Sequence, residues 1–308
     1  MGASDMKKYL LQIALFFVIV AVVDFAAGKL FRYVQSNRAG GRTGAEWYAC
    51  RESNEDIIIM GSSRASHHYV PQILSDSLGM SCFNAGQDGN GIILQYGRWK
   101  MISERYHPRI IIYDINPSFD FGKNDNMTYI DRLKPFCDDN RVNNYVVELF
   151  PIEKVKLFSQ TYRYNYKFLE IISDCKKKKS DETRGYIPLF GQIREEVVNK
   201  PIDVTANFFD LDEIKLYYLE ELAKECKAVE TKLVFVVSPF YKGGGFNEDT
   251  FKEVKKIAEK YGAEFVYLNV GDKTTCVEWY KDSAHLNDTG ACEFTKELCC
   301  ILSRNMSN

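Results

Sequence analysis

The residue types best suited to catalysis are an aspartate and a histidine three positions apart near the C-terminus, Asp282 and His285. A serine nucleophile needs a neutral imidazole within hydrogen-bond reach, and that imidazole needs a carboxylate to fix its tautomer. One turn of chain can supply both groups. We therefore predict His285 as a general base and Asp282 as the residue that orients it. An exposed turn and a core histidine are the alternative.

Two further segments carry polar groups directly after apolar runs. Residues 61–64 (GSSR) follow the run 56–60 (DIIIM), and residues 84–91 (NAGQDGNG) follow the run 80–84 (MSCFN). The first presents two hydroxyls on a tight turn, although these could also be capping serines of a following helix. The second could bind a phosphate, although it lacks the Lys-Ser/Thr of a P-loop and the spacing of a dinucleotide fingerprint.

Short apolar runs alternate with longer helical patterns from about residue 55 onward, which indicates a parallel sheet covered by helices on both faces. The predicted fold class is α/β, a three-layer α/β/α sandwich with a mostly parallel five-stranded sheet. Because such sheets bind ligands at the carboxyl ends of their strands, the three polar segments are expected to meet at one edge. Strands are predicted over 56–60, 80–84, 109–115, 232–237 and 264–268, and helices over 71–78, 92–106, 211–228, 248–261 and 289–302.

An apolar stretch near the N-terminus covers residues 9–28, with Gln12 and Asp24 as its polar members. It has about the ~20 residues that a spanning helix needs, and it is apolar all round. We predict a membrane anchor; a buried helix and a cleaved signal peptide are the alternatives. Two lysines precede the stretch and four basic residues follow it by residue 42, so charge alone does not settle the orientation.

The predicted domain organisation follows from these elements. Residues 1–32 form an N-terminal tail and transmembrane anchor, residues 33–54 read as a linker because of their glycines and polar residues, and residues 55–303 form the globular domain. Residues 118–210 break the alternation and are predicted as an insertion that overhangs the carboxyl edge of the sheet as a candidate lid or substrate platform.

Three tyrosines in the predicted insertion, Tyr162, Tyr164 and Tyr166, alternate with polar residues. In a strand they would share one face, as a sugar platform requires, whereas in a helix they would scatter and pack. Packing is the favoured interpretation.

Charge and cysteine content exclude several classes of protein. The chain has 40 Lys and Arg against 42 Asp and Glu, which is too balanced for a protein that mainly binds nucleic-acid phosphates. Its nine cysteines form no C-x-x-C pair and have no histidine at zinc-ligand spacing, so neither a zinc site nor a disulfide framework is predicted. We expect no metal and no organic cofactor.

The order GSSR, NAGQDGNG and DSAHLN resembles blocks I, II and V of the SGNH/GDSL hydrolase superfamily, over about residues 56–303 apart from the insertion. The resemblance implies a flavodoxin-like SGNH hydrolase fold with Ser63 as nucleophile and Ser62 where the family usually has aspartate. It also implies the D-x-x-H dyad formed by Asp282 and His285.

The resemblance further implies an oxyanion hole made by the backbone N–H groups of Ser63 and Gly86. The G-x-N-D of block III is absent, so Asn116, which follows the third predicted strand, is the expected third donor. Losing one such donor typically costs ~10²–10³ in rate.

Anchored superfamily members with a G-S-S block act on cell-envelope polymers. The resemblance therefore implies a membrane-anchored serine esterase or acyltransferase that acts on acyl groups, above all O-acetyl groups, of envelope glycans or on a small ester, with its catalytic domain extracytoplasmic. One rival is a non-catalytic scaffold of the same fold that binds a glycan or an enzyme partner. The other is a lipase-like esterase that faces the inner leaflet.

Overall fold

The structure is a computed structural model that describes residues 3–117, 120–124, 126–177, 183–199, 210–243, 248–268 and 271–307. The chain forms two compact units. Residues 1–47 and 130–180 make up one of them, called the N-terminal unit here. Residues 48–129 and 181–308 make up the other, called the α/β unit.

The α/β unit is built on a five-stranded sheet in the order β2-β1-β3-β4-β5, and every neighbouring pair of strands is parallel. The isoleucine-rich strands β1 and β3 are buried along their whole length, as expected for a sheet with both faces covered. This confirms the predicted mostly parallel five-stranded sheet. The strands are β1 (Ile57–Met60), β2 (Cys82–Asn84), β3 (Ile110–Asp114), β4 (Lys232–Val237) and β5 (Glu264–Tyr267).

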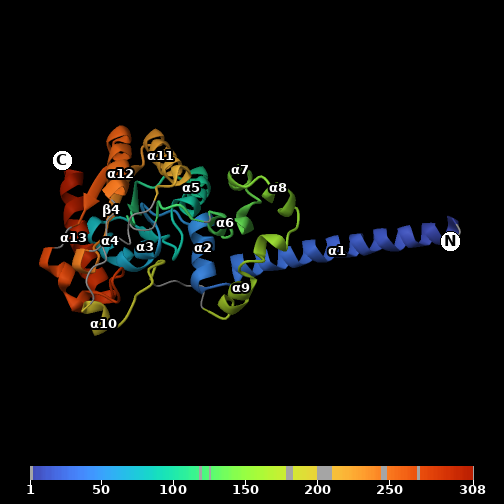
Figure 1. Cartoon of the computed structure of the whole chain (residues 1–308), viewed down its shortest axis with the longest axis horizontal. Coiled ribbons are helices and arrows are strands. Elements are labelled where there is room, and N and C mark those ends of the chain that lie inside the picture. Colours follow the sequence, from blue (N-terminus) through green and yellow to red (C-terminus); the bar gives the residue numbers. More distant parts are fainter. Residues whose placement is uncertain are drawn as a thin grey trace. The chain divides into compact units, whose positions relative to one another are not determined.

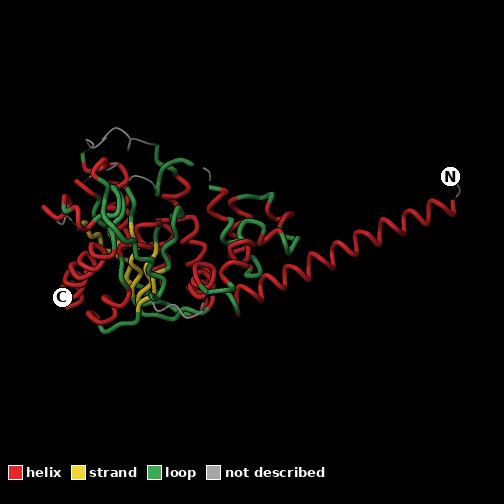
Figure 2. Tube along the Cα trace, turned by 90° about the horizontal axis from the view of Figure 1, so that it is seen from below, coloured by secondary structure: helices red, strands yellow, loops and turns green. Residues whose placement is uncertain are grey.

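Helices pack against the sheet in two groups (Figures 1 and 2). One group contains α3 (Ser63–His68), α4 (Pro71–Leu78) and α13 (Asp288–Ser307). The other contains α5 (Ile92–Arg105), α11 (Glu213–Ala228) and α12 (Glu248–Tyr261). All five predicted helices are present. Shorter elements are α10 (Glu195–Val198) and the 3₁₀ turns Tyr241–Gly243, Gly271–Thr275 and Val277–Trp279.

The strand order places a topological switch between β1 and β3, because the chain runs from β1 to β2 on one side and to β3 on the other. Ligands of open α/β sheets bind in the crevice outside the carboxyl ends of the strands at such a point. The GSSR segment follows β1, and Asn116 lies two residues beyond the end of β3. The topology therefore directs these residues toward the same crevice.

The N-terminal unit is helical and is held together by buried ion pairs. The Glu46 carboxylate accepts a hydrogen bond from the Lys167 ammonium at 2.6 Å and pairs with Arg132, and Asp174 accepts one from the Thr43 hydroxyl at 3.0 Å. Its helices are α1 (Ala3–Asn37), α7 (Asn140–Leu149), α8 (Glu153–Lys156) and α9 (Phe168–Asp174), with 3₁₀ turns at Lys134–Phe136 and Tyr162–Tyr164. Two further helices, α2 (Gly41–Arg51) and α6 (Met127–Ile130), cross the boundary between the units.

Helix α1 carries the predicted span. Residues 4–37 are long and apolar enough to cross a membrane, with a mean hydropathy of 2.5 over the most apolar window and none of that window buried. A signal sequence shares these properties, so the helix is compatible with an anchor or with a signal sequence.

Two expectations differ from the structure. Residues 33–54 are mostly helical and do not form an irregular linker: α1 continues to Asn37 and α2 follows at Gly41. The predicted insertion is not one body either, because residues 130–180 belong to the N-terminal unit and residues 183–199 to the α/β unit. Its residues 118–119, 125, 178–182 and 200–209 lie outside the described part of the chain.

The tyrosine alternation in the insertion reflects packing. Tyr162–Tyr164 is a 3₁₀ turn, so the platform that a strand would form is absent from this segment. Tyr164 is buried and stacks on Phe31 with ring centroids 5.7 Å apart, while the Tyr162 hydroxyl donates to Glu153 at 3.0 Å. The favoured prediction of packing is confirmed for Tyr162 and Tyr164, whereas Tyr166 is 52% exposed.

Candidate active site

The loop before α13 holds Asp282 and His285 in a closed turn. Residues Tyr280 and Leu286 form an antiparallel bridge across its base, and the Lys281 N–H donates to the His285 carbonyl at 2.9 Å. Inside the turn, Asp282 Oδ1 accepts the backbone N–H groups of Ala284 at 2.8 Å and His285 at 2.9 Å. The three-residue spacing is therefore a local requirement, because one carboxylate both builds the turn and faces the imidazole.

The residues after His285 fix where this loop sits. Asn287 Oδ1 accepts the N–H of Gly290 at 3.0 Å, and the Asn287 amide donates to the Glu278 carbonyl at 2.8 Å. A Cβ on Gly290 would lie 2.2 Å from the Trp279 carbonyl oxygen. The asparagine and glycine of the H-L-N-x-x-G pattern therefore hold the loop against the start of α13, through the Asn287 hydrogen bonds and the close approach at Gly290.

Ser63 is the first residue of α3, and only Gly61 and Ser62 separate it from the end of β1. Gly61 has φ +137°, and a Cβ there would lie 2.9 Å from the Asp114 carbonyl oxygen. Both observations require glycine at this turn. As the first helical residue, Ser63 has a backbone N–H without an acceptor inside the helix.

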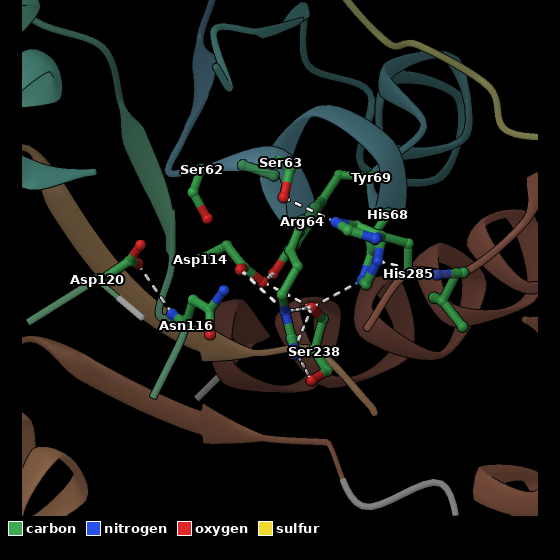
Figure 3. Close-up of polar contacts among 12 residues, drawn as sticks. Ser62, Ser63, Arg64, His68, Tyr69, Asp114, Asn116, Asp120, Ser238 and His285 are labelled. Carbon is green, nitrogen blue, oxygen red and sulfur yellow. Dashed lines mark hydrogen bonds and ion pairs between the residues drawn. The ribbon is translucent and has the colours of Figure 1, made fainter. Parts of the chain in front are cut away.

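Ser63, His285 and Asp282 form a continuous hydrogen-bonded chain, of which Figure 3 shows the contact between Ser63 and His285. His285 Nδ1 lies 3.0 Å from both carboxylate oxygens of Asp282, so Nδ1 carries the proton and Nε2 is the acceptor. The Ser63 hydroxyl then donates to Nε2 at 2.8 Å. Burial opposes ionisation of Asp282, but hydrogen bonds from His285 and its neighbours together with the His285 charge lower the pKa of this carboxyl below its ordinary value. Asp282 is therefore a carboxylate at neutral pH.

The neighbouring serine occupies a different environment. The Ser62 side chain is turned away from His285 in Figure 3, and the residue is 1% exposed. Among the described residues its hydroxyl has no hydrogen-bond partner. Only Ser63 of the two reaches the imidazole.

The backbone N–H groups of the predicted oxyanion donors Gly86 and Asn116 both have acceptors within the protein. Gly86 packs against α3 so closely that a Cβ would lie 2.4 Å from the Ser66 nitrogen, and its N–H donates to Asn84 Oδ1 at 2.9 Å. Asn116 is buried, and its backbone N–H donates to Asp120 Oδ2 at 2.9 Å. The oxyanion assignment of Ser63, Gly86 and Asn116 stays a prediction.

A buried chain of hydrogen bonds supports the loop that carries Asp282 and His285, and sequence reasoning missed it (Figure 3). The Leu286 N–H donates to His68 Nε2 at 3.0 Å, so His68 carries its proton on Nδ1 and donates to Ser238 Oγ at 2.8 Å. The Ser238 hydroxyl donates in turn to Asp114 Oδ2 at 2.8 Å. Burial, followed by the nearby Arg64 charge, lowers the pKa of His68 well below its ordinary value, so this imidazole is neutral. His68 thereby holds the backbone next to His285.

Arg64 completes this chain of hydrogen bonds. Its guanidinium is fully buried, 3.5 Å from Asp114 Oδ1, and it donates to Ser238 Oγ at 2.7 Å. It also lies over the Phe240 ring, 3.6 Å from the centroid, and Asp114 accepts a further hydrogen bond from the Tyr69 hydroxyl at 2.5 Å. Burial raises the pKa of Asp114 and lowers that of Arg64, and their mutual attraction opposes both shifts. The pair is mutually dependent because neither charge has water to solvate it.

Residues 187–191 contact two side chains next to the site, His67 and Lys281. The Ile187 carbonyl lies 2.7 Å from His67 Nδ1, and the Phe190 carbonyl accepts from the Lys281 ammonium at 2.8 Å. The other ring nitrogen of His67 lies 3.2 Å from Asp88 Oδ1. Both nitrogens of His67 are therefore engaged, and His285 is the imidazole that serves Ser63.

Metal ligands are not clustered in this site. Within the described ranges, three or more His, Cys, Asp or Glu side chains nowhere gather in a way that could hold a metal ion. The side chains of this site that are suited to chemistry are Ser63, His285 and Asp282.

The buried carboxyl of Asp120 predicts a pH effect on stability. Burial raises its pKa from 3.8 to about 7, so the folded state binds this proton more tightly than the unfolded state. The protonated Asp120 carboxyl contributes fully to the stability of the folded state below the unfolded pKa. This contribution to the free energy of unfolding is lost as pH rises through about 7, by on the order of 4 kcal/mol.

Replacing Asp120 by asparagine tests this effect, because Asp120→Asn retains a carbonyl acceptor and cannot ionise. We expect urea unfolding to show that the variant gains stability relative to wild type between about pH 4 and pH 8. Parallel stability curves would contradict a buried, protonated Asp120.

Comparisons with known proteins were made at the levels of sequence and structure. No protein-family model and no curated protein matches the chain. Among solved structures, the psychrotrophic esterase EstA from Pseudoalteromonas sp. aligns at 12% identity and a TM-score of 0.44, covering 82% of this chain and 98% of that chain. LAE5, an α/β hydrolase enzyme from the metagenome of Lake Arreo, Spain, aligns at 10% identity and a TM-score of 0.40, covering 83% and 97%.

A catalytic mutant of Axe2, an acetylxylan esterase from Geobacillus stearothermophilus, aligns at 12% identity and a TM-score of 0.38, covering 80% of this chain and 93% of that chain. These are distant similarities.

Proposed function

We propose that this protein is a membrane-anchored serine esterase or acyltransferase of the SGNH type. One observation carries the proposal: the Ser63 hydroxyl donates to His285 Nε2 at 2.8 Å, while both oxygens of Asp282 lie 3.0 Å from His285 Nδ1. A serine, a neutral imidazole and a carboxylate in this geometry are the groups that nucleophilic acyl transfer requires.

In the proposed reaction, Ser63 Oγ attacks the ester carbonyl carbon and its proton passes to His285 Nε2. The resulting oxyanion receives hydrogen bonds from the N–H groups of Ser63 and Gly86, with Asn116 as third donor. Gly86 shares its N–H with Asn84 or releases that bond as the oxyanion forms. The alcohol leaves with the proton from His285, and water or an acceptor hydroxyl then resolves the acyl-enzyme by the reverse sequence.

The substrate class proposed is an O-acetylated glycan of the cell envelope. It follows from the resemblance of GSSR, NAGQDGNG and DSAHLN to anchored SGNH proteins, together with the apolar helix α1. The catalytic unit is proposed to lie outside the cytoplasm, and C-terminal reporter fusions active only on one side of the membrane test this placement. Reporter activity in the cytoplasm would support the lipase-like rival at the inner leaflet.

Acetate release tests the reaction itself. The full-length chain is incubated with an O-acetylated glycan and, separately, with an activated acetyl ester, with Ser63→Ala as the control. We expect Ser63-dependent acetate release from both. Transfer of acetyl to an added unacetylated glycan identifies an acyltransferase, whereas no turnover of either substrate would contradict the enzyme and support a scaffold.

The membrane anchor makes a separate prediction. If α1 spans a bilayer, the full-length protein remains in the membrane fraction after an alkaline carbonate wash, because about 20 buried apolar residues cannot return to water. Immunoblotting of pellet and supernatant measures this, with a known peripheral protein as the released control. Release of the full-length chain would indicate an interfacial helix or a processed signal.

A further inference from the structure

Residues 151–158 of the N-terminal unit expose apolar side chains to the surface and bury a carboxylate, the reverse of what is expected in water. In residues 151–158, the side chains of Ile152, Val155 and Phe158 are 55%, 66% and 79% exposed. The inward residues are Glu153, which is fully buried, and Leu157. A segment that buries its carboxylate and exposes its aliphatic and aromatic side chains is unusual on a surface that faces only water.

Hydrogen bonds and an ion pair with the interior of the N-terminal unit fix the orientation of residues 151–158. Glu153 accepts a hydrogen bond from the Tyr162 hydroxyl at 3.0 Å and pairs with the Lys134 ammonium at 3.5 Å. The Leu157 carbonyl accepts from the Arg163 guanidinium at 3.0 Å. The outward direction of Ile152, Val155 and Phe158 is therefore set by the fold of the N-terminal unit.

The same segment leads directly into the contact with α1. Ser159, the residue after Phe158, donates from its hydroxyl to Asp24 Oδ1 at 2.7 Å, and the Gln160 N–H donates to Asp24 Oδ2 at 2.7 Å. At Gly28 the approach is so close that a Cβ would lie 2.3 Å from Gln160 Cβ. The chain segment carrying Phe158 is thus tied to α1 at Asp24.

Asp24 marks the level at which the apolar part of α1 ends. Residues 9–23 contain no Asp, Glu, Lys or Arg, and Asp24 is the first ionisable acid or base after them. Figure 1 shows α8 at the end of the N-terminal unit from which the N-terminal half of α1 projects. The exposed apolar side chains consequently lie beside the point where the span would leave the bilayer.

We propose that residues 151–158 rest in the interfacial region of the membrane that α1 crosses. Ile152, Val155 and Phe158 enter the boundary between headgroups and acyl chains, and the exposed Lys154 faces lipid phosphates, whereas the Lys156 ammonium pairs with Glu153 at 3.1 Å. This inference rests on α1 being the membrane span of the proposed function. Its occupant is the phospholipid surface itself, because the segment continues directly into the contact with the span and contains no exposed carboxylate.

Quenching by brominated lipids tests the proposal in the full-length chain reconstituted into phospholipid vesicles. Three variants are compared, Phe158→Trp, Phe16→Trp within the apolar part of α1, and Ile214→Trp on α11 of the α/β unit, after subtraction of the wild-type emission. Phe158 is highly exposed, so the substitution does not disturb packing. We expect lipids brominated near the headgroup end of the acyl chain to remove most of the Phe158→Trp emission and to leave the Ile214→Trp emission unchanged.

The Phe16→Trp variant distinguishes failure of the membrane span from failure of the interfacial position of residues 151–158. Quenching of Phe16→Trp without quenching of Phe158→Trp would overturn the interfacial segment and leave the span intact, as it would if the segment bound another protein. Absence of Phe16→Trp quenching by lipids brominated near the end of the acyl chain, at the bilayer centre, would overturn the span and with it this inference. Equal quenching of Phe158→Trp and Ile214→Trp would also contradict a specific contact of residues 151–158 with lipid.

Discussion

Replacing Ser63 by alanine is expected to reduce turnover of an activated acetyl ester by on the order of 10⁴-fold or more, leaving only background. The variant lacks the oxygen that attacks the carbonyl, and His285 then has no proton to accept. His285→Ala should cost about as much, and the double variant should be scarcely slower than either single variant, because the two residues act in one step. Initial rates with an activated acetyl ester measure all three.

The adjacent serine provides the matched control. Ser62 differs from Ser63 by one position, yet it is buried and does not contact His285. Ser62→Ala should therefore retain most of the activity. Loss of activity in Ser62→Ala but not in Ser63→Ala would mean that the nucleophile has been assigned to the wrong serine, and undiminished activity of Ser63→Ala would exclude the serine mechanism.

The second large effect concerns the buried ion pair beneath the site. Asp114→Ala leaves the fully buried Arg64 guanidinium without its carboxylate and removes the acceptor of the Tyr69 and Ser238 hydroxyls. Breaking a buried pair by removing one partner typically costs 3–5 kcal/mol, and we expect about this loss in the free energy of unfolding. Urea unfolding of the full-length variant in detergent measures it.

A surface pair and a double variant are the controls. Glu253→Ala removes an exposed i,i+3 partner of Lys256 and should cost about 0.5 kcal/mol or less. Arg64→Met combined with Asp114→Ala should be much less destabilised than the sum of the single variants, because neither charge then stays buried alone. Additive losses in this cycle would contradict a coupled pair.

The framework of the α/β unit was predictable because each strand is a continuous apolar run bounded by turn residues. The isoleucines of β1 and β3 are buried along the whole length of both strands, as expected for a parallel sheet with helices on both faces. The Asp282–His285 spacing was equally informative, since the turn it builds is local. Ser63 could be chosen over Ser62 only through the family resemblance, and the structure adds the contact with His285.

The buried chain of hydrogen bonds could not be predicted, because its members are brought together only by the sheet. Ser238 lies 170 positions from His68 and 124 from Asp114. A weak signal was present: Asp114 ends an apolar strand, and Arg64 follows a buried turn, so each polar residue stood in a buried context. Neither observation identifies the partner.

Residues 33–54 were misinterpreted because glycine has two structural uses. The glycines and polar residues of this segment predict a linker. In the structure a Cβ on Gly44 would lie 2.4 Å from the Ala39 carbonyl oxygen, and Gly41 has φ +53°. These glycines allow close approach and a sharp turn between α1 and α2. Sequence alone does not distinguish that use from flexibility.

The most direct test of the central claim is labelling with a fluorophosphonate probe, followed by mass-spectrometric mapping of the modified residue. An activated serine attacks phosphorus and displaces fluoride, so the adduct marks the oxygen that His285 activates. We expect a single stoichiometric adduct on Ser63, absent in Ser63→Ala and strongly slowed in His285→Ala. An adduct on Ser62 or another residue, or an intact chain that remains unlabelled, would contradict it.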